Sequence, residues 1–100
     1  MLHTVNKSPY SSDSLKLCQG YMQSGDAVLL IEDGVYGAMA GGSSESMVKE
    51  MVAGTKVYAL GPDLKARGIA SEKLVDGIEV VGFDGFVALA AEHDKVQNWL

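Results

Sequence analysis

Cys18 is the only cysteine of the chain and therefore its only possible thiol nucleophile. A reactive cysteine needs a lowered pKa, which a helix N-terminus, a nearby cation or a histidine can provide. Cys18 falls in the second turn of an expected helix, and Lys16 is near it in sequence. Leu15 and Met22 share its helix face, so the same pattern is typical of a small hydrophobic side chain in the core. Packing is the favoured interpretation, and thiol reactivity is the alternative.

Glu32 and Asp33 form the one pair of carboxylates at the expected functional edge of a sheet. They follow five consecutive apolar residues, 27–31, and precede Gly34. Such a run, bounded by turn residues, is typical of a strand covered on both faces, as in a parallel sheet flanked by helices. Open α/β sheets place functional groups at the carboxyl ends of their strands. The pair has either a direct chemical role or, more commonly, a role as a solvated cap or partner contact.

Other motifs that carry chemistry are sparse. No Gly-x-Gly-x-x-Gly or Gly-x-x-x-x-Gly-Lys-Ser/Thr sequence is present, and the glycine–serine segment 41–44 lacks the lysine of a phosphate loop. His3 and His93 are far apart and form no i, i+4 pair of metal ligands. His93 is expected on the face of the last helix. We therefore expect neither a metal nor an organic cofactor.

The elements that must position these side chains alternate regularly along the chain. We expect strands at residues 1–5, 27–31, 56–60 and 78–83. We expect helices from residues 11–13 to about 24, at 44–53, at 63–67 and from 84 onward, and a short helical turn at 35–40. Gly20, inside the first helix, costs about 1 kcal/mol relative to alanine, and we attribute its presence to close packing.

This order predicts one α/β domain over residues 1–100, with three layers and a mostly parallel sheet flanked by helices. The last helix should carry its apolar stripe on one face, made of Phe86, Leu89, Ala90 and His93. The expected class is flavodoxin-like in its general arrangement.

Charge and hydropathy exclude several classes of protein. The net charge of −5 and the scattered basic residues argue against nucleic-acid binding. No apolar run approaches the ~20 residues that span a bilayer, and the first residues do not resemble a signal peptide, so we expect a cytoplasmic protein. A single cysteine forms neither an intrachain disulfide nor a cysteine-based zinc site. Tyr10, Tyr36 and Met39, in expected loops, favour contacts with partner proteins.

Five blocks of the sequence resemble the DsrH/TusB family, in order and over nearly the whole chain. They are residues 1–10 (MLHTVNKSPY), 25–36 (GDAVLLIEDGVY), 57–68 (VYALGPDLKARG), 85–89 (GFVAL) and 96–99 (VQNW). The resemblance implies a DsrE/F-like fold and a subunit of a cytoplasmic sulfur relay. Its partners would be DsrE/TusD-like and DsrF/TusC-like subunits in a dimer of heterotrimers, with no membrane or direct nucleic-acid contact.

In such a relay, persulfide sulfur passes to an acceptor of the DsrC/TusE type. One branch of the family serves dissimilatory sulfur oxidation, and the other serves 2-thiolation of a tRNA wobble uridine. Residues 6–9, residues 61–68 and Cys18 look more like the sulfur-oxidising branch, which we favour at this point.

The resemblance assigns the main sulfur-carrying cysteine to the DsrE/TusD-like subunit. Cys18 matches a cysteine of sulfur-oxidising members and is here at most an auxiliary persulfide site. Two other functions stay open, namely a stand-alone thiol sulfurtransferase that uses Cys18 and a flavodoxin-like ligand-binding module.

Overall fold

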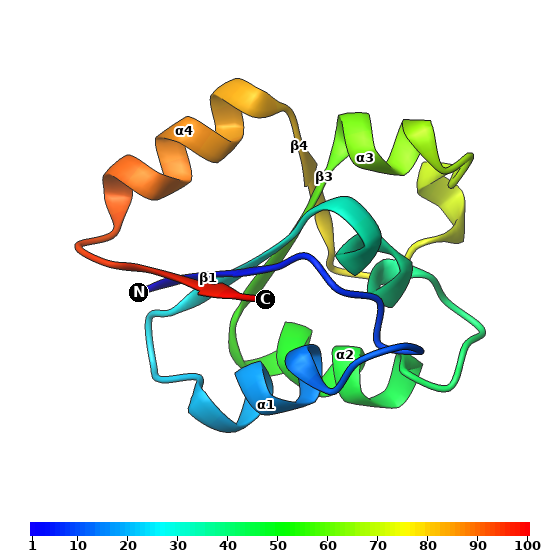
Figure 1. Cartoon of the computed structure of the whole chain (residues 1–100), viewed down its shortest axis with the longest axis horizontal. Coiled ribbons are helices and arrows are strands. Elements are labelled where there is room, and N and C mark those ends of the chain that lie inside the picture. Colours follow the sequence, from blue (N-terminus) through cyan, green and yellow to red (C-terminus); the bar gives the residue numbers. More distant parts are fainter.

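Five parallel strands form the centre of the computed structural model, which describes residues 1–100 (Figure 1). The strands are β1 (Leu2–Val5), β2 (Ala27–Leu30), β3 (Lys56–Leu60), β4 (Glu79–Val81) and β5 (Val96–Trp99). Their order across the sheet is β4-β3-β2-β1-β5, and every neighbouring pair is parallel. The chain thus steps outward from β1 to β4 and then returns to place β5 on the other side of β1.

Helices connect the strands and cover both faces of the sheet. They are α1 (Ser14–Tyr21), α2 (Glu45–Gly54), α3 (Gly61–Ala66) and α4 (Phe83–Glu92), with 3₁₀ helices η1 (Glu32–Ala38) and η2 (Ser71–Lys73). In Figure 1, α1 and α2 lie below the sheet and α4 lies above it. Right-handed crossovers place the three outward connections on one face and the return connection, α4, on the other.

The two faces are buried to different extents. The hydrophobic core under α1 and α2 contains fourteen buried residues, among them Leu15, Cys18 and Leu30, whereas the core under α4 contains five, among them Leu2, Leu29 and Leu89. The central strands are buried on both faces, since β1 and β2 have no exposed residue. This confirms the three-layer α/β architecture predicted from the continuous apolar run.

Strand β5 was not predicted. Gln97 and Asn98 are exposed because β5 is an edge strand, so its sequence has no apolar run to reveal it. It nevertheless pairs with all four residues of β1. The predicted last strand at 78–83 is shorter in the structure, and its final residue, Phe83, instead begins α4. The first helix ends at Tyr21 and not near residue 24, and the turn expected at 35–40 begins earlier, as η1.

Two glycines differ in the space that surrounds them. A Cβ added at Gly20 would meet no atom within 4 Å, so the close packing predicted for this position was wrong. A Cβ at Gly34 would lie 2.0 Å from the carbonyl oxygen of Val5. Gly34 therefore lets η1 lie directly against the end of β1, because any larger residue would clash with the backbone of Val5.

We expect Gly34→Ala to lower the free energy of unfolding by about 2 kcal/mol or more, because the new methyl group overlaps backbone. We expect Gly20→Ala to raise it by about 0.5–1 kcal/mol, because alanine is the better helix former and the site is open. Urea denaturation of the two variants measures both effects. Equal stability of the two variants would contradict the packing described for Gly34.

Candidate functional site

Cys18 lies in the core between α1 and the sheet, with no exposed surface. Its Sγ is 4.0 Å from the Sδ of Met22, one helical turn later. Burial, and secondarily the negative charge of Asp26, raise the pKa of the Cys18 thiol to about 12. A thiol of this kind holds almost no thiolate at neutral pH. The geometry is that of a packing residue, and the auxiliary persulfide role of Cys18 stays a prediction that requires α1 to open.

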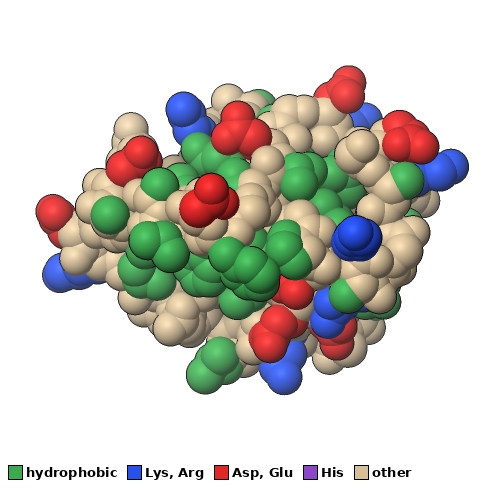
Figure 2. All heavy atoms as spheres, turned by 90° about the horizontal axis from the view of Figure 1, so that it is seen from above, with side chains coloured by type: hydrophobic (Ala, Val, Ile, Leu, Met, Phe, Trp, Pro, Cys, Tyr) green, Lys and Arg blue, Asp and Glu red, His purple; other side chains and the backbone are tan.

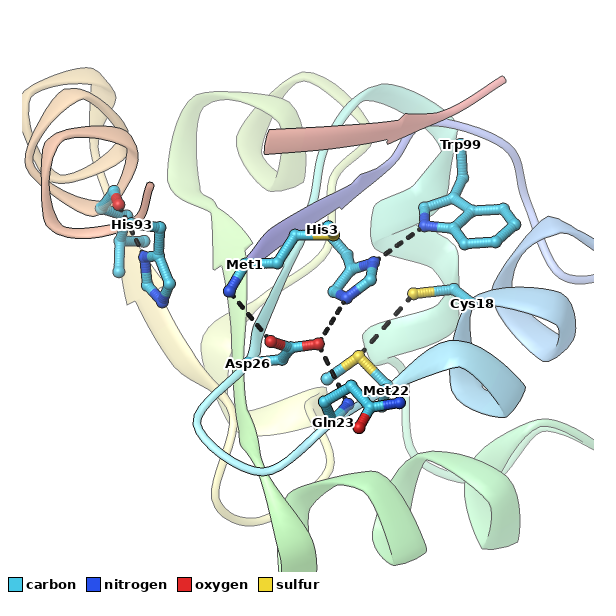
Figure 3. A network of polar contacts seen from close by, with 9 residues as sticks. Met1, His3, Cys18, Met22, Gln23, Asp26, His93 and Trp99 are labelled. Atoms are coloured by element: carbon cyan, nitrogen blue, oxygen red, sulfur yellow. Dashed lines mark hydrogen bonds and ion pairs between the residues drawn. The ribbon is translucent and has the colours of Figure 1, made fainter. Parts of the chain in front are cut away.

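A buried polar network lies beside this core, and the sequence did not predict it (Figure 3). Asp26, just before β2, accepts hydrogen bonds from the backbone N–H of Gln23 at 3.0 Å and from the amino group of Met1 at 2.9 Å. His3 Nε2 is 2.9 Å from Asp26 Oδ2, and Trp99 Nε1 is 3.0 Å from His3 Nδ1. The network joins β1, the turn before β2 and the last strand. Its only signals in the sequence are a histidine inside a short apolar strand and an aspartate next to an apolar run.

The network determines which ring nitrogen of His3 carries the proton. An indole N–H can only donate, so Nδ1 of His3 must accept from Trp99. The proton of neutral His3 is then on Nε2, where it is donated to Asp26. Both ring nitrogens are used, and the ring is 2% exposed. His3 is consequently a structural link and not a free general base.

Asp26 is a carboxylate kept ionised inside the fold. Burial by itself would raise its pKa, but hydrogen bonds from His3, from the Met1 amino group and from the Gln23 N–H outweigh burial. The pKa of Asp26 is therefore held well below its ordinary value of 3.8.

A cavity of about 660 Å³ opens beside the network. Tyr21 and Trp99 form its aromatic part, with ring centroids 5.4 Å apart and planes inclined at 51°. Gln23 and Gln97 add amide groups to its lining. The cavity offers stacking and hydrogen bonding but no thiol, because Cys18 is not among its lining residues.

The carboxylate pair at the carboxyl end of β2 does not converge on a common point. Asp33 pairs with Arg67, with Oδ1 2.9 Å from Nη2 and 3.0 Å from Nε. The backbone N–H of Glu32 donates to Asp63 Oδ2 at 2.6 Å, and Glu32 has a positive φ of 49°. The carboxylate of Asp33 and the backbone of Glu32 therefore tie η1 to α3 and the residue that follows it, Arg67.

The other predicted residues also have local partners. His93 follows α4, and its Nδ1 lies 2.8 Å from the carbonyl oxygen of Leu89. The glycine–serine loop packs around Tyr10, whose hydroxyl oxygen is 3.3 Å from Ser44 Oγ. Tyr36 and Met39, predicted as partner contacts, are half-buried against the larger core. None of the helices has the length and hydropathy that a membrane-spanning segment requires.

The five-stranded parallel sheet with helices on both faces defines a three-layer α/β domain. The family described as "DsrH like protein" matches residues 7–96, and the chain belongs to this family. It is 37% identical over 99 residues to Protein TusB of Pectobacterium carotovorum subsp. carotovorum, an alignment that covers 99% of this chain and 100% of that protein. The corresponding identity is 39% for Protein TusB of Enterobacter sp. and 34% for that of Escherichia coli K12, with the same coverage.

Solved structures support the same fold. The ychN protein of E. coli superimposes with a TM-score of 0.82 at 22% identity, covering 97% of each chain. MTH1491 of Methanobacterium thermoautotrophicum, titled a protein of unknown function, gives a TM-score of 0.75 at 19% identity, covering 97% of this chain and 96% of that one. At these identities the likeness concerns the fold alone.

We expect Cys18 to react with a thiol reagent such as DTNB at least about 100-fold more slowly in the native protein than in urea, because burial removes both access and thiolate. Stopped-flow absorbance measures the two rates on the same protein. Similar rates in the two conditions would contradict the burial of this thiol.

We expect Asp26→Asn to be less stable than wild type at pH 7, by about 1–3 kcal/mol, because charge-assisted hydrogen bonds are lost. The folded-state pKa is lowered, so the contribution of Asp26 is complete above its ordinary value of 3.8 and is lost as the pH falls below it. The variant should therefore lose less stability than wild type between about pH 5 and 2.

Urea denaturation across this pH range measures the effect. The exposed Asp94 provides a matched control, since Asp94→Asn should follow the wild-type curve. A wild-type acid profile in Asp26→Asn would show that the network contributes nothing to stability.

Proposed function

We propose that this chain is a subunit of a cytoplasmic complex that relays persulfide sulfur to an acceptor of the TusE/DsrC type. Its partners would be TusC/DsrF-like and TusD/DsrE-like subunits in a dimer of heterotrimers. The observation that carries this proposal is similarity to TusB proteins over essentially the whole chain. Membership of the family supports the sulfur-relay role that the resemblance implies.

The environment of Cys18 fits a subunit that does not carry the principal thiol. Persulfide transfer needs an accessible thiolate that attacks the outer sulfur; a new S–S bond forms, the old one breaks, and the donor leaves as a thiolate. No oxidant, metal or organic cofactor enters this exchange. Cys18 has neither access nor thiolate character in this fold. The raised pKa also argues against a stand-alone sulfurtransferase, which would need a depressed one.

Thiolation of a tRNA wobble uridine is the pathway we now propose. The curated relatives described above carry the name of the TusB branch, which the resemblance links to tRNA modification. Dissimilatory sulfur oxidation, favoured from the sequence blocks, is the second candidate, and its specific support is the presence of Cys18.

Co-expression with the sister subunits tests the assembly. We expect native mass spectrometry to show a complex of three different subunits, which transfers sulfur to a TusE/DsrC-type acceptor. We expect Cys18→Ala to leave most of the transfer rate, whereas replacing the sulfur-carrying cysteine of the sister subunit abolishes it. Failure of the wild-type chain to retain either sister subunit would overturn the relay assignment. Complete loss of transfer in a folded Cys18→Ala complex would overturn the secondary status of Cys18.

Deletion in the host separates the two pathways. We expect nucleoside mass spectrometry of the deletion strain to show loss of 2-thiouridine derivatives from tRNA, restored by the wild-type chain. Unchanged tRNA thiolation together with loss of sulfur oxidation would instead assign the second pathway.

A further inference from the structure

Helix α4 is apolar on both its inner and its outer side. Phe86, Leu89 and Ala90 face the sheet and join the smaller core. On the outer side, Phe83 and Val87 are 62% and 69% exposed. A helix that is hydrophobic all round is normally buried on all sides. The outer side of α4 therefore has the apolar composition that is typical of a surface buried against another part of a protein.

The exposed side chains of α4 form two adjacent rows at i, i+4 spacing. Phe83, Val87 and Ala91 make an apolar row, and Asp84, Ala88 and Glu92 make the row beside it. We call these six residues the α4 patch. Figure 2 looks onto this side of the molecule and shows hydrophobic side chains gathered there with acidic groups beside them. Val96 of β5, 43% exposed, continues the apolar surface, because it pairs with Leu2 and so faces the same side of the sheet.

The arrangement of charge decides which partner fits. The only charges on α4 are Asp84 and Glu92, separated by about 12 Å along the axis. An antiparallel pairing of two copies would oppose Asp84 to Glu92 at both ends, and a parallel pairing would oppose each carboxylate to itself. Both arrangements place like charges together, which is unfavourable in an otherwise apolar contact. A partner with an apolar helix between two cationic side chains would instead be complementary.

We propose that the α4 patch is the contact surface for a different subunit of the relay complex, one that presents an apolar helix flanked by Lys or Arg. This inference rests on the proposed function, since it takes the partner to be a sister subunit. It also explains why α4 covers its face of the sheet alone and leaves so small a core there.

The test compares Val87→Glu with Leu17→Glu in co-expression with the TusC/DsrF-like and TusD/DsrE-like subunits. Leu17 lies on α1, on the opposite face of the sheet, and is 55% exposed. Both variants add the same charge at an exposed helical position, so both should fold, which circular dichroism and the Tm verify. We expect Leu17→Glu to assemble as wild type does and Val87→Glu to lose at least about tenfold in affinity for the sister subunit.

A charge reversal at both ends of the patch, Asp84→Lys with Glu92→Lys, tests the complementarity separately. We expect it to weaken assembly and to invert the dependence of the association rate on salt. Wild-type assembly by Val87→Glu would overturn the proposed surface while leaving the relay function intact. Self-association of the wild-type chain that Val87→Glu abolishes would assign the patch to a second copy and overturn the choice of partner. If the wild-type chain retains no sister subunit, the proposed function fails, and this inference fails with it.

Discussion

The buried carboxylate of Asp26 is the interaction on which the arrangement around the first strand depends. It receives hydrogen bonds from the turn after α1, from the amino group of Met1 and from His3. Through His3 it also orients Trp99, which is 96 residues from His3 in the chain. An ionised carboxylate in the interior is tolerated only when such donors replace its water. The turn before β2, the central strand β1 and the edge strand β5 are thereby held in one geometry.

The same carboxylate bears on the sulfur chemistry. Its negative charge adds to burial in disfavouring the thiolate of Cys18. The interaction that stabilises this part of the fold thus suppresses the one group that could carry a persulfide. In the proposed assembly, a subunit of this design would contribute shape and contact surface, while a cysteine on another subunit would contribute the reactive sulfur.

The two faces of the sheet are covered unequally, and this difference indicates where the proposed contact surface lies. Three connections cover one face and build the larger core, whereas the single return connection, α4, covers the other. One helix cannot bury the face of a five-stranded sheet, and the apolar outer side of α4 extends the hydrophobic surface into solvent. In the proposed assembly, both features would be completed by a neighbouring subunit.

The sequence by itself determined the architecture of the central strands, the parallel sheet and the family. Apolar runs such as residues 27–31, and the turn residues that bound them, are local signals that keep their meaning in any context. Only the tertiary structure decided the place of β5, the burial of Cys18 and the His3–Asp26–Trp99 network. Those features depend on partners separated by 23 to 96 positions, or on which face of a helix meets the sheet. A pattern read along the chain can favour one face of a helix, as it did for Cys18, but it does not show which distant residues will meet, because their pairing arises from long-range packing.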